Sequence, residues 1–264
     1  HCRNHITNFS IKQTMKTLEE YAPNERKVVY FIDDIDYNNL GYKEEGKELL
    51  TNPELLLVPL KRTEEFLDNY TIIEDIQPYN GMTVTISPYD RTKYSEVIKA
   101  NENFAVEKLA NILRICHLIG AKSVKTEKVF AAKHSTEESA HLGGNIKAVS
   151  GSIDAKSTYL NEMVSKLKYD ATYSGGQCDY EAAKRYLRKS RLSGDRFLEE
   201  LVEMANASNN KLQRISQEIS LSSNMESTNE LLSKISFPVA GGKFQLNEKK
   251  VSEEKYYLTI EIEF

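Results

Sequence analysis

The chain has 264 residues, of which 35 are basic and 39 acidic, so its formal net charge is −4. This near balance excludes a general attraction to nucleic acid or anionic lipid, and any phosphate-binding site must be a local basic patch. No apolar run approaches the roughly 18 residues of a membrane-spanning helix. The three cysteines have no CxxC spacing, which argues against a disulfide framework. We therefore expect a cytoplasmic protein without a transmembrane helix.

The first part of the chain, residues 1–90, predicts a small α/β region. Ser10 with Gln13 is a capping-box pattern, so we expect a helix near the N-terminus. Residues 27–33 are a short apolar run with β-branched and aromatic side chains, which is typical of a buried strand.

Residues 50–90 contain several turn signals. Pro53 suits the first turn of a helix, and residues 63–70 predict a second short helix after a break at Pro59. Residues 71–87 are two alternating runs around Asn80 and Gly81. An Asn-Gly pair between such runs predicts a β-hairpin.

The longest periodic segment is residues 94–119, where apolar side chains recur every three or four positions and Gly120 follows. This pattern predicts a long helix packed deep against a sheet. Further elements are expected by period and composition: strands at 124–130, 145–155, 163–173, 215–221 and 256–264, and helices at 180–192, 195–207 and 224–234. The most regular strand pattern is at 256–264, where apolar and polar residues alternate throughout.

Together these elements predict an α+β fold, with mostly antiparallel sheets packed on a long central helix at about 94–119. Additional helices are expected at the N-terminus and at about 180–207. The division into domains stays open between two regions, 1–90 and 91–264, and one continuous domain 1–264.

An acidic cluster directly follows the first predicted strand. Asp33, Asp34 and Asp36 place carboxylates at neighbouring positions, where they can converge on Mg²⁺ or Ca²⁺. The Asp34 and Asp36 pair resembles the nucleophile and acid of haloacid-dehalogenase-type phosphatases, although Asn38 stands where that family has Thr. The resemblance implies phosphoryl transfer, and the three carboxylates together make a divalent-metal phosphohydrolase or nuclease the second hypothesis for this chain. The alternative is a solvated turn rich in Asx residues.

A basic cluster lies on the predicted helix at 180–192 and consists of Lys184, Arg185, Arg188, Lys189 and Arg191. Several of these side chains are four residues apart, so like charges are stacked on adjacent faces at some cost in stability. Such a helix can bind phosphate groups of nucleic acid, anionic lipid or an acidic protein partner. The alternative is a solvated face balanced by carboxylates from elsewhere in the fold.

A membrane-acting function is a further alternative. A membrane β-strand needs about 9–11 residues with one apolar and one polar side, and residues 163–173 satisfy that length. This segment suggests a β-pore-forming effector, although any amphipathic sheet has the same pattern.

The chain contains no complete catalytic motif. We therefore expect a non-enzymatic interaction or assembly protein that binds a protein partner or associates with itself, without a resident cofactor. The basic helix at 184–191 and the loop at 134–145 are the expected contact surfaces.

Overall fold

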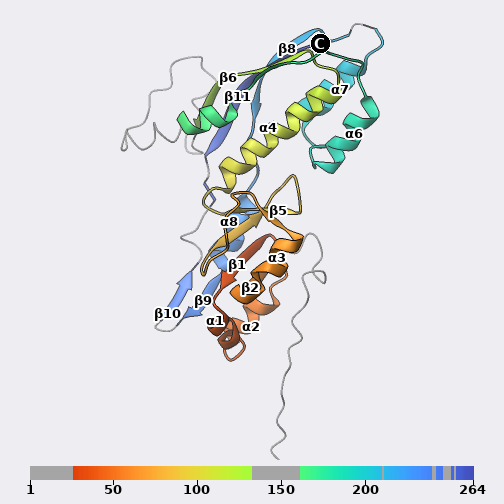
Figure 1. The fold of residues 1–264 in the computed structure, drawn as a ribbon. Coiled ribbons are helices and arrows are strands. Elements are labelled where there is room, and N and C mark those ends of the chain that lie inside the picture. Colours follow the sequence, from red (N-terminus) through yellow and green to blue (C-terminus); the bar gives the residue numbers. More distant parts are fainter. Residues whose placement is uncertain (1–25, 133–160, 210, 240–241, 246–250, 253) are drawn as a thin grey trace, which may run out of the picture.

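The computed structural model describes residues 26–132, 161–209, 211–239, 242–245, 251–252 and 254–264. Helices combine with antiparallel-rich sheets, which confirms the predicted α+β class. Two sheets lie toward opposite ends of the molecule, and helix α4 (Ala100–Leu118) leads from the lower sheet to the upper one (Figure 1). The helix expected near Ser10 and the loop at 134–145 are outside the described residues.

The lower sheet has the strand order β2-β1-β4-β5-β3. Its strands are β1 (Val28–Ile32), β2 (Leu55–Pro59), β3 (Thr71–Ile72), β4 (Thr83–Ile86) and β5 (Lys93–Glu96). β1 runs parallel to β2 and antiparallel to β4. Every residue of β1 and β2 is buried, as expected of strands that are covered on both faces. The strand predicted at 27–33 is confirmed.

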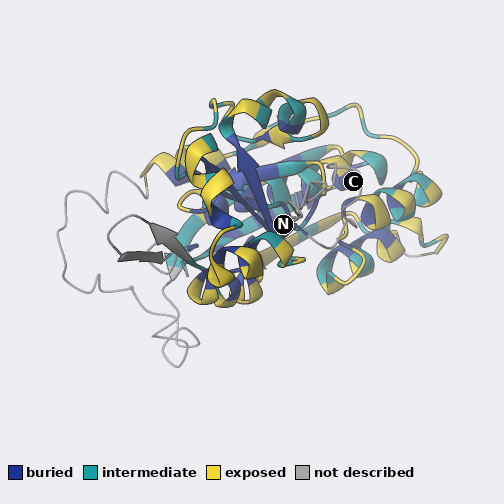
Figure 2. Cartoon of the chain, turned by 90° about the horizontal axis from the view of Figure 1, so that it is seen from below, coloured by how far each residue is buried: buried dark blue, intermediate teal, exposed yellow. Residues whose placement is uncertain are grey.

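Different helices cover the two faces of the lower sheet. They are α1 (Asp34–Leu40), α2 (Glu44–Thr51), the 3₁₀ turn η2 (Leu60–Arg62) and α3 (Thr63–Asn69). On one face Phe31 meets Phe66 of α3, with ring centroids 5.3 Å apart in an edge-to-face arrangement. On the other face Tyr30 belongs to a core that contains Leu40 and Leu49 from α1 and α2. Figure 2 shows the buried strands in dark blue inside helices whose outer sides are exposed.

The hairpin predicted at 71–87 is wrong. β4 lies between β1 and β5, whereas β3 pairs in parallel with β5. Gly81 does turn the chain, with φ +86°, but its N–H donates to the carbonyl oxygen of Phe31 at 2.8 Å. Pairing with β1 therefore takes the place of the local hairpin.

The helix start predicted at Pro53 is also wrong. Residues 44–51 already form α2, and Pro53 lies in the turn before β2, which begins at Leu55. Three consecutive leucines and a valine follow in a buried parallel strand, a run that periodicity alone does not distinguish from a helix. The short helix predicted at 63–70 is confirmed as α3.

Helix α4 begins at Ala100, later than the predicted start at 94, because residues 93–96 form β5. The predicted apolar face is buried and includes Leu109, Ile112 and Cys116. The helix ends in a Schellman motif at Gly120, which has φ +84° and whose N–H donates to the carbonyl oxygen of His117 at 3.2 Å.

The upper sheet is antiparallel throughout and has the order β7-β6-β11-β8. Its strands are β6 (Ser123–Ala132), β7 (Asp170–Thr172), β8 (Arg214–Ser220) and β11 (Lys255–Glu263). The alternation predicted at 256–264 is confirmed, since the apolar positions of β11 are buried and its polar positions are not. The remaining described elements are α6 (Tyr180–Lys189), α7 (Arg196–Asn206), α8 (Glu226–Lys234) and a small sheet of β9 (Ser236–Val239) and β10 (Gly242–Gln245).

The strand predicted at 163–173 is wrong over most of its length. Residues 161–167 are helical, and only β7 at 170–172 is extended. Met163 and Leu167 are both buried, which fits the four-residue spacing of one helical face. The β-pore hypothesis loses this support and stays a prediction, and the strand expected at 145–155 lies outside the described residues. Among the helices that the structure describes, none combines the length and apolarity needed to cross a bilayer.

Candidate functional site

Helix α6 carries the predicted basic cluster and is held firmly on its inner side. Ala183 and Leu187 are buried, so the opposite side of the helix faces solvent. The N-cap is Asp179, whose Oδ1 accepts a hydrogen bond from the backbone N–H of Ala182 at 3.0 Å. This cap satisfies an otherwise unpaired donor and fixes where the helix begins.

The end of α6 is a second Schellman motif, but with arginine where glycine is usual. Arg191 has φ +59°, and its N–H donates to the carbonyl oxygen of Arg188 at 3.2 Å. The N–H of Leu192 donates to the carbonyl oxygen of Leu187 at 2.9 Å, and both leucine side chains are buried. The helix thus has a defined end, although Arg191 adopts a left-handed conformation that costs a non-glycine residue free energy.

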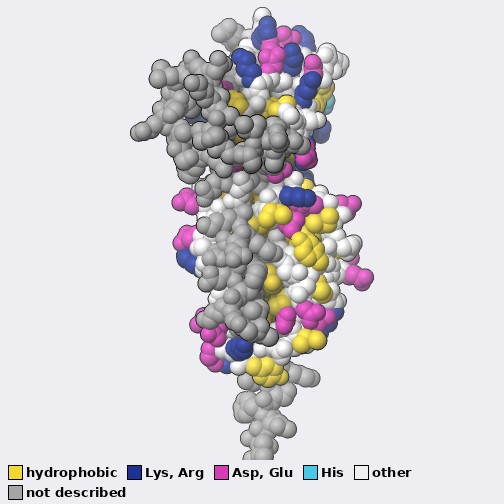
Figure 3. All heavy atoms as spheres, turned by 90° about the vertical axis from the view of Figure 1, so that its left-hand side faces the viewer, with side chains coloured by type: hydrophobic (Ala, Val, Ile, Leu, Met, Phe, Trp, Pro, Cys, Tyr) yellow, Lys and Arg dark blue, Asp and Glu magenta, His cyan; other side chains and the backbone are white. Residues whose placement is uncertain are grey.

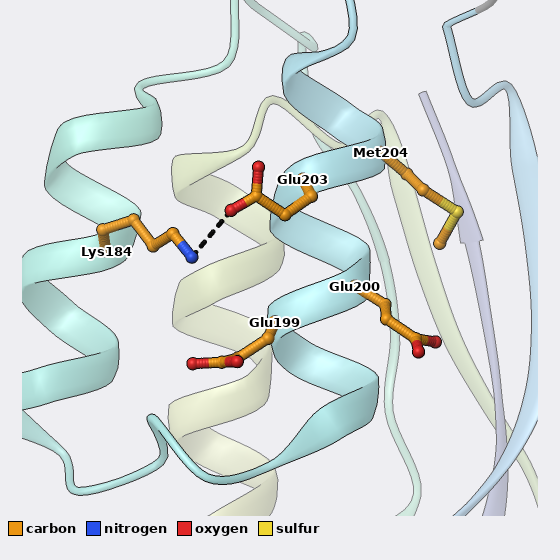
Figure 4. Close-up of a pocket in the computed structure, with 5 residues that line it drawn as sticks. All are labelled: Lys184, Glu199, Glu200, Glu203 and Met204. Carbon is orange, nitrogen blue, oxygen red and sulfur yellow. Dashed lines mark ion pairs between the residues drawn. The ribbon is translucent and has the colours of Figure 1, made fainter.

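One predicted cation, Lys184, is engaged within the fold. Its Nζ lies 2.8 Å from Oε1 of Glu203 on α7, and the two side chains point toward one another across the gap between the helices (Figure 4). The hydroxyl of Tyr180 donates to the same oxygen at 2.8 Å. These contacts raise the pKa of Lys184 and lower that of Glu203. Lys184 therefore links α6 to α7, and its charge is less free to bind a ligand than the charges of its neighbours.

The other four predicted cations are free of such contacts. Their side chains are exposed, and none of them forms an ion pair with a residue in the described parts of the chain: Arg185, Arg188, Lys189 and Arg191. We call these four residues the α6 cationic face. Among the residues that the structure describes, Lys184 is thus the one member of the basic cluster with the carboxylate partner that the solvated-face alternative requires.

A shallow hollow adjoins this face between α6 and α7. Two openings there have volumes of about 350 and 380 Å³ and share Lys184 and Glu199 in their linings. The wall on α7 is acidic, with Glu199, Glu200 and Glu203, and Met204 adds an exposed apolar side chain. In Figure 4 Glu199 extends toward α6, whereas Glu200 and Met204 extend away from it. The region therefore presents both charge signs and some apolar surface.

The acidic wall on α7 has only a weak signal in the sequence. Glu203 was not a candidate, because its contact with Lys184 joins two helices whose relative position follows from tertiary packing. The one local signal is that Tyr180 and Lys184 are four residues apart on a helix, which places them on the same face.

The acidic cluster after β1 forms the first turn of α1. Asp33 is the N-cap and accepts a hydrogen bond from the N–H of Ile35 at 2.8 Å, and Asp34 accepts one from the N–H of Lys61 at 3.4 Å. The pKa of Tyr30 is raised by burial and, to a smaller degree, by the charge of Asp36. Negative side chains here stabilise the helix N-terminus.

This arrangement gives the three carboxylates a structural role, but it does not test the metal hypothesis directly. Within the described residues, no three histidine, cysteine, aspartate or glutamate side chains are grouped so that they could hold a metal ion. A phosphohydrolase or nuclease that uses Asp33, Asp34 and Asp36 stays a prediction.

Comparisons with models of protein families, with curated proteins and with solved structures find no match. Function is therefore inferred from the geometry of this chain. Within that geometry, the α6 cationic face and the adjoining hollow are the strongest candidate site.

Proposed function

We propose that this chain is a non-enzymatic interaction protein, which binds an acidic surface of a partner protein through the α6 cationic face. The observation that carries the proposal is that four neighbouring cations are exposed and lack ion pairs within the described chain. Placing like charges side by side costs stability. That cost is offset when an acidic partner binds.

A protein partner fits this surface better than nucleic acid does. The carboxylate of Glu199 extends toward α6, lines the same hollow as Arg188 and would repel a continuous phosphate backbone. Protein interfaces, in contrast, combine both charge signs with apolar side chains, and arginine is enriched in them.

The helix is also prepared for binding. The cap at Asp179, the buried Leu187 and the Lys184–Glu203 ion pair hold its backbone in place before a partner arrives. Binding then costs mainly the rotamer entropy of the exposed side chains. Each exposed ion pair contributes only about 0.2–1 kcal/mol, so the surface is suited to moderate affinity and fast association.

The test is fluorescence anisotropy with a labelled polyglutamate peptide at low salt. A variant with all four residues of the α6 cationic face changed to Gln is expected to bind at least tenfold more weakly than the unaltered chain. The matched control changes four exposed cations elsewhere to Gln, namely Lys43, Lys61, Arg91 and Lys99, so that the net charge changes equally.

Equal weakening by both sets would show that only net charge matters and would contradict the proposal. Duplex DNA serves as the competing probe. Tighter binding of DNA than of polyglutamate, lost in the α6 variant alone, would favour nucleic acid as the partner and would also contradict the proposal.

A further inference from the structure

Strand β8 forms an open edge of the upper sheet. It pairs with β11, and no other described strand pairs with it. Ser216, Gln217 and Glu218 in its centre are all exposed. The side chain of Gln217 lies on the same sheet face as buried Ile219 and is nevertheless exposed, so the described helices leave this stretch of the edge uncovered.

The hydrogen bonds to β11 determine which backbone groups point outward. The N–H of Leu221 donates to Tyr256 at 2.8 Å, and the N–H of Phe264 donates to Gln213 at 2.9 Å. In an antiparallel pair such bonds recur at alternate residues, so the odd-numbered residues of β8 face β11. Arg214, Ser216 and Glu218 therefore turn their N–H and C=O groups away from the sheet.

An independent contact supports this parity. The outward carbonyl oxygen of Ser220 accepts a hydrogen bond from Nζ of Lys108 at 2.9 Å. Lys108 thus closes one end of the edge. The outward groups of Arg214 and Ser216, with the N–H of Glu218, have no partner among the described residues. Unpaired edge groups of this kind form a template for another strand.

We propose that the β8 edge binds the β8 edge of a second copy of this chain, antiparallel, with Ser216 on the two-fold axis. In this register Arg214 lies directly opposite Glu218 of the second copy, and Glu218 lies opposite its Arg214. The three outward residues then exchange about six backbone hydrogen bonds, two for each facing pair. The two upper sheets become one continuous sheet across an isologous interface.

The charge pattern selects this register and this occupant. A two-fold axis at Arg214 or at Glu218 would place like charges opposite one another, which is destabilising. Registers that are displaced by two residues to either side leave both charges opposite uncharged residues. The register centred on Ser216 pairs both charges with their opposites, so the edge is complementary to itself.

Arg214 is able to take part while it keeps its own contacts. It forms an ion pair with Glu261, and its Nε lies 3.8 Å from Glu263 on β11. Its side chain is 63% exposed, and a guanidinium has five donors. Glu218 is exposed and has no ion pair with any described residue. Its contacts with Glu261 and Glu263 thus hold the Arg214 side chain on the outer face of the sheet, and its remaining N–H donors can bind a second carboxylate.

The test is sedimentation velocity on the full chain over a range of concentrations. We expect the chain to be mostly dimeric at a concentration of about 100 μM, because a dissociation constant of about 1 μM gives nearly complete association there. Ser216→Pro removes the outward N–H on the axis without removing a bond to β11, and is expected to be monomeric. Its unfolding temperature should equal that of the unaltered chain when both are measured at a concentration well below the dissociation constant, where dimerisation adds no stability. Ser216→Ala keeps the N–H and is expected to remain dimeric.

A charge exchange tests the register without proline. Glu218→Arg alone and Arg214→Glu alone each place like charges across the axis and should be monomeric. An equimolar mixture of the two variants restores opposite charges on both sides and should form a heterodimer.

Three results would overturn the proposal. They are a monomeric unaltered chain at about 100 μM, a Ser216→Pro variant that dimerises as well as the unaltered chain, and a mixture of the charge variants that stays monomeric. None of these results bears on the α6 cationic face, which lies on a different element.

Discussion

Nζ of Lys108, in the middle of α4, lies 2.8 Å from Oδ2 of Asp195, the N-cap residue of α7. The other carboxylate oxygen of Asp195 accepts a hydrogen bond from the N–H of Leu198 at 3.3 Å. Because Lys108 also donates to Ser220, one side chain joins α4, α7 and β8. The side chains of Lys108 and Asp195 are only 12% and 20% exposed, so this ion pair is shielded from solvent.

Replacing Lys108 with Met should therefore destabilise the protein. The change leaves the Asp195 carboxylate and the Ser220 carbonyl without their cationic partner, at a cost of about 1–3 kcal/mol in the free energy of unfolding. Urea denaturation measures it. The control is Lys234→Met, which breaks an ion pair with Glu230 whose side chains are 68% and 63% exposed and should change the stability by under about 0.5 kcal/mol. Equal losses in the two variants would contradict a role for shielding.

Replacing Arg191 with Gly should stabilise the protein. The residue has φ +59°, and glycine adopts this conformation without the steric cost of a Cβ atom, a difference of about 1 kcal/mol. The control is Arg185→Gly, an identical change inside the same helix, which should cost about 1 kcal/mol. Urea denaturation of both variants should give shifts of opposite sign. A loss of stability in Arg191→Gly would contradict the helix end described above.

Replacing Gly120 with Ala should destabilise the protein strongly. The residue has φ +84°, and a Cβ atom there would lie 2.4 Å from the carbonyl oxygen of Gly176. Because both the backbone conformation and the contact oppose the change, we expect a loss of more than about 2 kcal/mol. Gly194→Ala is the matched control, since its Cβ would meet nothing within 4 Å. Similar thermal unfolding temperatures for the two variants would contradict the close approach.

The thiol of Cys116 should make stability depend on alkaline pH. Complete burial raises its pKa from the ordinary value of 9.0 to about 12, so the folded state keeps the thiol neutral while the unfolded state ionises it. This contribution is fully present below pH 9 and is lost as the pH rises from 9 toward 12. From pH 8 to pH 10 the protein should lose about 1.4 kcal/mol more than the Cys116→Ala variant does. Parallel pH dependences of the two unfolding free energies would contradict it.

Local sequence patterns correctly predicted the helices and strands that bury one face against the rest of the fold. The alternation of β11 and the three-to-four spacing of α4 each record one buried side, and both appear in the structure. The same holds for α6 and α7, whose inner residues Leu187 and Leu201 are buried as their spacing indicates.

The errors come from contacts between distant segments. Asn80 and Gly81 have the composition of a hairpin turn, but β4 finds β1 and β5 as its neighbours. Residues 163–167 satisfy both a strand pattern and a helical one, and the burial of Met163 with Leu167 resolves the choice only in three dimensions. The basic cluster behaves in the same way, since its sequence does not reveal that Glu203 on α7 pairs with Lys184 alone.

The upper end of the molecule, in the view of Figure 3, carries basic and acidic side chains close together. An acidic ligand that is attracted only by general electrostatics would therefore bind at several surfaces, whereas the proposed function requires it to bind at α6. Mapping where an acidic ligand binds separates these two cases.

The most direct measurement is amide hydrogen exchange of the full chain with and without a polyglutamate peptide. Slower amide exchange is expected in α6, at residues 180–189, and in the turn through Arg191 that ends it. The exchange of the outer sheet face at β6 and β11 should be unchanged. Protection confined to other elements, or no protection at a peptide concentration that saturates the anisotropy signal, would contradict the claim that α6 is the binding surface.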